Sequence, residues 1–434
     1  MNNPHTLLPS TRREFLRTGA RGIGLLAFSR FAPDFLTSTA LAGAPPPESD
    51  RSILVLIQLA GGNDGLNTLV PYADDHYHRL RPTIGLKTSD VLRIDDHHGL
   101  HPSLAPFREM LDAGSLGVVQ NVGYPNPNRS HFRSTEIWET ASESDDYLPS
   151  GWLGRFFDNQ CGGTPATAPG ATATPSTTPT PSDIPVGIHA SNEVPPSFLG
   201  ENPHNIFGLS RGALRPRHAG AARLVEGLLA AEPAASAGAG ADDNLSFLQH
   251  TMLDALATEK RIQRVLGGMK PDGAYPGDPF ANALRGVAEL IAARLPTRVY
   301  FVSLGGFDTH GNQLGTHAQL LKQLADGMAA FQKDLTRRGL ADQVLTMTFS
   351  EFGRRPSENE SKGTDHGTAA PLFVMGSRLK AGLHGTAPSL DVGANRDLAF
   401  STDFRRVYAT VLDRWLGCDA RAVLGASFKP VEFL

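Results

Sequence analysis

The chain has 434 residues, of which 40% are hydrophobic, 19% charged and 7% aromatic, so it holds enough apolar material for one large globular domain or two medium ones. Its formal net charge is −4 and no block of Lys and Arg stands out beyond the first 42 residues, which argues against a nucleic-acid-binding protein. No stretch reaches the roughly 20 apolar residues of a membrane-spanning helix, so we expect no membrane span.

The first 42 residues have the pattern of an export signal. STRREFLRTGARGIGLLAF (10–28) contains the pair Arg12 and Arg13 before a short, weakly apolar stretch, and ALAG (40–43) offers a cleavage site after Ala42. The alternative is an amphipathic N-terminal helix. The first interpretation predicts recognition by the twin-arginine export machinery and a mature protein that is periplasmic or secreted.

Apolar strands that run into small and polar residues recur along the rest of the chain. SILVLIQLAGGNDGLNTLVPY (52–72) is typical of a buried parallel strand followed by a Gly-rich loop. SLAPFREMLDAGSLGVVQNV (103–122) predicts a helix, a Gly stop and a second strand. RVYFVSLGGFDTHGN (298–312) and QVLTMTFSEFGR (343–354) repeat the pattern of a strand that ends in acidic or His residues.

The C-terminal part continues the alternation of strands and helices. An amphipathic helix is predicted over 314–339, a short strand at 371–376, and a helix over 401–417 with Ser401 or Thr402 as its N-cap and Gly417 as its stop. This alternation predicts an α/β layered fold with a largely parallel sheet.

Two segments and two cysteines stand apart from this pattern. Residues 162–183 are a low-complexity Pro, Thr, Ala and Gly insertion, and the helices of about 220–270 are expected to form a helical insertion or lid. The remaining chain, 43–434, is expected to form the α/β domain. Cys161 and Cys418 either pair in a disulfide or remain two separate thiols.

Candidate metal ligands follow the predicted strands. In an open α/β sheet, ligands bind at the carboxyl ends of the strands, where loops from distant parts of the sequence meet. A mixed carboxylate and imidazole set without thiolate suits a divalent metal ion such as Zn, Mn, Fe or Mg. The candidates are Asp64, Asp308, His310, Glu351, Asp365 and His366.

Each candidate has a plainer alternative. Asp64 after two glycines is often a turn residue, and Glu351 at a strand end can simply pair with Arg354. Ser130 in NPNRSHFRSTEIWETA (126–141) lies near the start of a predicted helix, where a hydroxyl nucleophile or an N-cap would both be well placed. The HH-rich segment RIDDHHGLHP (93–102) is explained by a solvated loop, with His101 facing inward.

Eight motifs in order carry a resemblance to a known family. They are LAGGNDGLNTLVP, HPSLAPF, NRSHFRSTEIWETA, GWLGR, GGFDTHGNQ, SEFGRRPSEN, GTDHG and DFRRVYATVLDRWLG. Together they resemble the exported family of unknown function that usually begins with a twin-arginine signal and that is placed in the alkaline phosphatase and sulfatase superfamily.

The resemblance implies an alkaline-phosphatase-like three-layer α/β/α sandwich. It implies that Asp64 and Ser130 match a metal and nucleophile site, that Asp308 and His310 serve a second metal, and that His366 completes the ligand set. Glu351 matches the first place of an Asp-His dipeptide whose second place is Phe352 here, so one metal or an altered pair is as plausible as a two-metal centre.

These observations favour a metal-dependent hydrolase of phosphate or sulfate esters. A metal would polarise a small anionic ester substrate and lower the pKa of Ser130 or a water, while Arg354 and Arg355 would clamp the anion. The alternative is a non-catalytic exported binding or assembly protein with a degenerate metal site.

Overall fold

The computed structural model describes residues 51–159, 185–209, 259, 261–269, 274–393 and 396–434. The predicted export signal, the low-complexity insertion, most of the segment 220–270, and Cys161 lie outside the described residues. Cys418 is disulfide-bonded, and the described residues include no free thiol.

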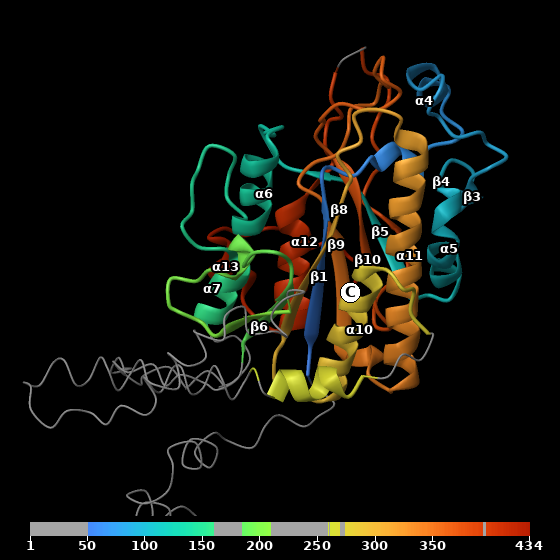
Figure 1. Ribbon diagram of the computed structural model, residues 1–434. Coiled ribbons are helices and arrows are strands. Elements are labelled where there is room, and N and C mark those ends of the chain that lie inside the picture. Colours follow the sequence, from blue (N-terminus) through green and yellow to red (C-terminus); the bar gives the residue numbers. More distant parts are fainter. Residues whose placement is uncertain (1–50, 160–184, 210–258, 260, 270–273, 394–395) are drawn as a thin grey trace, which may run out of the picture. The chain divides into compact units, whose positions relative to one another are not determined.

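A nine-stranded sheet forms the centre of the described fold (Figure 1). Its order is β11-β5-β10-β9-β1-β8-β6-β7, and β12 pairs with β5. The described strands of this sheet are parallel except β10, which is antiparallel to both its neighbours. They are β1 (Ile53–Ala60), β5 (Leu116–Gly123), β6 (Gly187–Ala190), β7 (Ile206–Gly208), β8 (Val299–Gly305), β9 (Val344–Phe349), β10 (Ala370–Met375), β11 (Gly382–His384) and β12 (Thr402–Asp403).

Helices cover both faces of this sheet. Ile53, Val55, Ile57 and Leu59 of β1 pack on one side, in the same core as α5 (Ala105–Asp112), α10 (Pro279–Ala292) and α11 (Gln313–Arg337). Leu54 and Leu56 pack on the other side. The helices there are α6 (His131–Thr140), α7 (Trp152–Asp158), α12 (Phe404–Thr410) and α13 (Ala420–Leu424).

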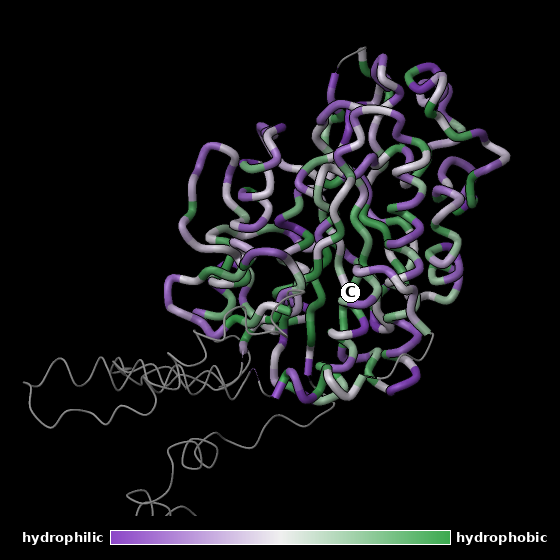
Figure 2. The backbone as a smooth tube through the Cα atoms, viewed as in Figure 1, coloured by the Kyte–Doolittle hydropathy of each residue, from purple (hydrophilic) through white to green (hydrophobic). Residues whose placement is uncertain are grey.

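Burial on both faces explains why β1 is apolar at nearly every position. Figure 2 shows the hydrophobic residues concentrated along the central strands. The predicted three-layer α/β/α sandwich with a mostly parallel sheet is therefore confirmed. Within the described ranges, no helix is long and apolar enough to cross a membrane.

Smaller elements connect the layers. A second sheet has the order β2-β4-β3, with β2 (Leu69–Val70), β4 (Gly99–Leu100) and β3 (Leu92–Arg93). A short helix, α4 (Asp75–Leu80), lies between β2 and β3 in the sequence. Single turns of 3-10 helix are η2 (Gly65–Asn67), η3 (Pro102–Leu104), η4 (Pro196–Phe198) and η5 (Ala341–Gln343).

The start of the C-terminal helix differs from the prediction. Neither Ser401 nor Thr402 is the N-cap, because Thr402 pairs with Val122 in the sheet and the carboxylate of Asp403 accepts the N–H of Arg405 at 2.9 Å. The helix α12 then continues as the π-helical turn η6 (Val411–Leu416). It ends at Gly417 with φ +67°, which is the predicted stop.

Glu139 is a buried acid on α6, the helix that packs on the same side of the sheet as Leu54 and Leu56. Its side chain is 3% exposed and its Oε2 atom has no hydrogen-bond partner. Burial raises the pKa of Glu139 from 4.5 to about 8, and the backbone N–H of Ser197 opposes this only in part. The folded protein therefore holds this carboxyl in its neutral form near pH 7.

We expect Glu139→Gln to flatten the pH dependence of stability. A carboxyl whose pKa is raised on folding contributes stability below about pH 4.5, and loses it as the pH rises towards about 8. The loss amounts to at most about 1.4 kcal/mol per pH unit for one group. Urea unfolding between these pH values should show a shallower slope for the variant, and equal slopes would contradict the assignment.

Candidate metal centre

Three adjacent parallel strands end within two residues of one another at one edge of the sheet. β1 lies between β8 and β9, with Ala60 opposite Gly305 and Gln58 opposite Phe349. The loops that follow these strands therefore begin side by side, as the carboxyl ends of parallel strands must. They carry Asp308 and His310 after β8, and Glu351 after β9.

Gly61 allows these loops to touch. Its φ is +120°, a left-handed conformation that disfavours a side chain, and a Cβ there would lie 2.4 Å from the backbone nitrogen of Asp308. Its N–H donates to Oε1 of Glu351 at 2.8 Å. The glycine thus links the β1 loop to both neighbouring loops.

Three histidines converge on one carboxylate oxygen. The distance to Oδ1 of Asp308 is 3.0 Å from Nε2 of His310, 3.2 Å from Nε2 of His366 and 3.5 Å from Nε2 of His131. The Nε2 atoms of His310 and His366 are 2.9 Å apart. The loop before β10 supplies His366, and the first residue of α6 supplies His131.

An oxygen faces the other nitrogen of each ring. Nδ1 of His131 lies 2.7 Å from Oε1 of Glu351, and Nδ1 of His366 lies 2.8 Å from the carbonyl oxygen of Arg129. Nδ1 of His310 faces Oδ1 of Asp365 at 3.5 Å. Because these oxygens can only accept, we assign the proton of the neutral ring to Nδ1 and the lone pair to Nε2.

This arrangement fits a metal ion. Ligand atoms of His131, Asp308 and His366 all lie within 4.8 Å of one another, and Nε2 of His131 is buried without a hydrogen-bond partner. Two lone pairs that face each other, as on His310 and His366, repel unless a cation or a proton lies between them. Imidazole and carboxylate donors suit Zn, Mn or Fe.

The electrostatics keep Asp308 ionised. Burial raises its pKa, but the hydrogen bond and the charge of Arg354 outweigh that effect and lower the pKa to about 2. The hydrogen bond to Glu351 raises the pKa of His131, whereas burial lowers that of His366. Asp308 is therefore available as an anionic ligand at neutral pH.

Arg354 contacts the centre through Asp308 and is 1% exposed. It donates to Oδ1 of Asp308 at 2.6 Å, to the carbonyl of Gly62 at 2.8 Å and to that of Thr364 at 2.9 Å. It also donates to the carbonyls of Gly61 and Phe307. Its predicted role as an anion clamp stays a prediction, and these contacts favour a positioning role.

Glu351 and Asp365 lie behind the histidines. Glu351 is 2% exposed and is occupied by His131 and the Gly61 N–H. Asp365 accepts a hydrogen bond from Asn359 at 3.0 Å, which lowers its pKa. Both were predicted as metal ligands, and that role stays a prediction. Their contacts favour a role in orienting His131 and His310.

Phe352 fills the space beside two of the histidines. Its ring centroid lies 4.9 Å from that of His131 and 4.7 Å from that of His366. The side chain is 1% exposed. The position that the resemblance reserves for an imidazole is thus an apolar wall of the centre.

The structure does not bring Asp64 into this cluster. Asp64 is fully buried, and its Oδ2 atom accepts from Arg81 at 2.6 Å and from Gln313. Burial raises the pKa of Asp64, but the charge and hydrogen bond of Arg81 outweigh it and lower the pKa. The predicted metal-ligand role of Asp64 therefore has no support from its contacts.

Ser130 occupies the N-cap position of α6 and is exposed. Its side chain makes no capping hydrogen bond, which leaves the hydroxyl free of that role. Its predicted role as a nucleophile stays a prediction. The neighbouring His131 was not predicted as a site residue, although the motif NRSHFRSTE contains it.

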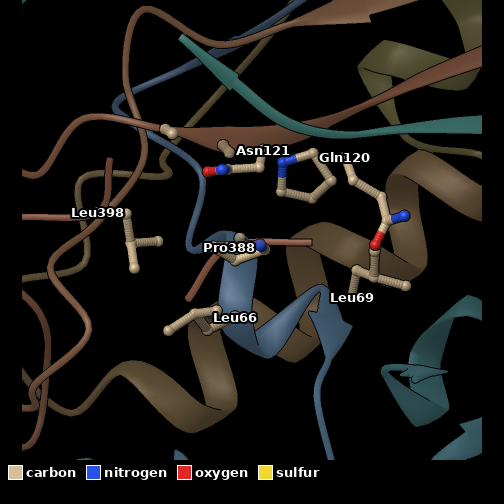
Figure 3. Close-up of a pocket in the computed structure, with 10 residues that line it drawn as sticks. Leu66, Leu69, Gln120, Asn121, Pro388 and Leu398 are labelled. Carbon is tan, nitrogen blue, oxygen red and sulfur yellow. The ribbon is translucent and has the colours of Figure 1, made fainter. Parts of the chain in front are cut away.

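A separate pocket lies away from the centre (Figure 3). Apolar walls from Leu66, Leu69, Pro388 and Leu398 surround the amides of Gln120 and Asn121. No residue of the histidine cluster lines it. We therefore assign it no part in the metal centre.

The fold and the site define an α/β/α protein with a histidine-rich candidate metal centre. The chain belongs to the family described as "Protein of unknown function (DUF1501)", which matches residues 51–426. This agrees with the predicted resemblance to a family of unknown function. Among curated proteins, none matches the chain significantly.

Solved structures show distant similarity. A protein in the alkaline phosphatase superfamily from Vibrio parahaemolyticus is 9% identical with a TM-score of 0.34, over 88% of this chain and 69% of that chain. The lipoteichoic acid synthase LtaP from Listeria monocytogenes is 9% identical with a TM-score of 0.34, over 85% and 80%. The C-terminal periplasmic domain of EcEptC from Escherichia coli, in complex with Zn, is 11% identical with a TM-score of 0.33, over 77% and 78%. Similarity at this level does not bear on the activity of this chain.

We expect Arg81→Met to destabilise the fold through Asp64. Removing one partner of a fully buried ion pair leaves the other charge uncompensated, which costs about 3–5 kcal/mol of unfolding free energy. The double variant Arg81→Met with Asp64→Asn should recover much of this loss. Urea unfolding measures both, and a double variant no more stable than the single one would contradict the pairing.

Proposed function

We propose that this protein is an exported, metal-dependent hydrolase of phosphate or sulfate esters. The observation that carries the proposal is the convergence of three imidazole Nε2 atoms on Oδ1 of Asp308. The pair Arg12–Arg13 supports export. His131, His310, His366 and Asp308 would hold the metal.

A bound divalent metal would polarise an ester oxygen and lower the pKa of a hydroxyl or water beside it. The residues of the chain hold the ligands ready for this. Glu351 fixes the ring of His131, the carbonyl of Arg129 fixes that of His366, and Arg354 fixes the carboxylate of Asp308. Such outer partners set both the tautomer and the orientation of a ligand.

Ser130 is the proposed nucleophile. It precedes His131 directly and stands at the N-terminus of α6, a helix of 10 residues whose free N–H groups favour negative charge. That position suits a hydroxyl that develops negative charge during attack on an anionic ester. The substrate would be a small anionic ester.

A second candidate function is a non-catalytic binding or assembly protein with a degenerate site. Phe352 stands where the resemblance predicts an imidazole. Guanidinium groups already contact two of the acidic residues, Arg81 at Asp64 and Arg354 at Asp308. A cation so close to Asp308 weakens the attraction of a metal. Metal-loaded protein that hydrolyses no ester would favour this candidate.

We expect Asp308→Ala and His366→Ala each to abolish stoichiometric metal binding without unfolding the protein. Both side chains reach solvent, so their loss removes ligands but little core packing. Glu351→Gln should lower metal affinity less, by about 10–100-fold, because it acts through His131. Elemental analysis of chelator-stripped and reloaded protein gives the metal content, and circular dichroism checks folding. His97→Ala, at an exposed residue of the loop before β4, is the control. Full metal content in the Asp308 and His366 variants would overturn the centre.

We expect Ser130→Ala to reduce kcat on aryl phosphates or sulfates by about 10²–10⁴-fold and to leave the metal content unchanged. The reason is that Ser130 would supply the attacking oxygen and no ligand. Initial rates across a panel of such esters, with each candidate metal, test this. An unchanged kcat would point to water as the nucleophile.

A further inference from the structure

Two arginines beside the metal centre share one carboxylate. NH1 of Arg129 lies 3.3 Å from Oδ2 of Asp397, and Nε of Arg355 lies 3.6 Å from Oδ1 of the same residue. The side chain of Arg129 is 46% exposed and those of Arg355 and Asp397 are 24% and 28% exposed. The three groups thus form a small charged cluster that solvent can reach.

The backbone holds both arginines against the centre. The carbonyl of Arg129 accepts the hydrogen bond that orients His366, and the N–H of Arg355 donates to the carbonyl of Asp365 at 3.0 Å. The charge of Arg355 also contributes to the lowered pKa of Asp365, behind its hydrogen bond from Asn359. Any ligand of the centre therefore lies within the field of these two cations.

The contact between Arg355 and Asp397 is incomplete. Nε of Arg355 and Oδ1 of Asp397 are buried atoms without a hydrogen-bond partner. By contrast, the surface pair of Arg414 and Glu432 has two contacts of 2.7 Å. A buried polar atom without a partner costs free energy, so this site gains from a ligand that supplies the missing oxygen.

The donors of Arg354 are already engaged. Its guanidinium is saturated by carbonyls and by Asp308, as described above. Arg129 and Arg355 retain unused donors, and guanidinium groups bind oxyanions through two parallel hydrogen bonds.

We propose that Arg129 and Arg355 bind the tetrahedral oxyanion of the substrate, and that Asp397 occupies them as an internal competitor when no substrate is bound. This inference rests on the proposed function and names the residues that recognise its substrate class. An incoming phosphate or sulfate group replaces the carboxylate of Asp397. Removal of that carboxylate therefore strengthens anion binding, whereas removal of either arginine weakens it.

Calorimetric titration of the full chain with inorganic phosphate, sulfate and acetate tests the proposal, with and without bound Zn. We expect Asp397→Asn to bind phosphate or sulfate about three- to tenfold more tightly, and Arg129→Gln or Arg355→Gln to bind about tenfold more weakly. Arg414→Gln and Glu432→Gln, which change a matched surface pair, should leave the affinity unchanged. Circular dichroism confirms that each variant is folded.

The outcomes separate this inference from the proposed function. Anion binding that depends on Arg129 and Arg355 supports the inference, even in protein that takes up no metal. Anion affinity that none of the three substitutions changes overturns it, even if the metal-loaded protein hydrolyses esters. Acetate that binds more tightly than phosphate and sulfate also overturns it, because the site would then prefer a planar carboxylate.

Discussion

The buried guanidinium of Arg354 is the constraint on which the rest of the site depends. A charged group that is 1% exposed must have its N–H donors satisfied within the protein, or the fold would not be stable. The acceptors come from three loops that are distant in sequence, after β1, after β8 and before β10. Their carbonyls converge because one cation requires them, and Asp308 is fixed at the same point. The glycine at position 61 follows from this, since no side chain fits between the loops that Arg354 draws together.

Two aspartates with similar sequence contexts have different environments for the same physical reason. Asp64 and Asp308 each follow a glycine-rich strand end, but Arg81 neutralises Asp64 in a fully dry ion pair. Arg354 contacts Asp308 from the protein interior, while the side chain of Asp308 remains 48% exposed to solvent. The first can therefore only stabilise the fold, whereas the second presents negative charge towards a ring of imidazoles. This difference favours one cation-binding position at the edge of the sheet over two.

Much of the fold follows from local patterns in the sequence. The strands β1, β8 and β9 are apolar runs that end at Gly or polar residues, and their burial on both faces explains that pattern. The sequence pattern did not predict the start of α12 correctly. Thr402 pairs with β5, and Asp403 therefore caps the helix. Among the site residues, Asp308, His310 and His366 lie together, as expected for loops at the carboxyl ends of parallel strands. His131 was missed because its role depends on Glu351, which is distant in sequence and contacts it only in the folded chain. The reverse holds for Glu351 and Asp365, whose carboxylates resemble ligands in sequence but face the outer nitrogens of the rings.

His131 faces the centre, whereas Glu351 and Asp365 face the outer nitrogens of the rings. This arrangement determines which metal ions the centre favours. The ligand set predicted from the sequence has four carboxylates and two imidazoles, and it suits Zn, Mn, Fe or Mg alike. The structure instead places imidazole nitrogens inward and most carboxylates outward, with the hydrogen bonds at Nδ1 holding the Nε2 lone pairs towards Asp308. One carboxylate with up to three imidazoles is a donor set of borderline softness, which favours Zn²⁺, Mn²⁺ or Fe²⁺. A divalent cation held there would keep net positive charge, because the negative charge of Asp308 is shared with Arg354. A centre with that balance attracts anions, and the two arginines beside it, Arg129 and Arg355, extend the same positive field towards solvent.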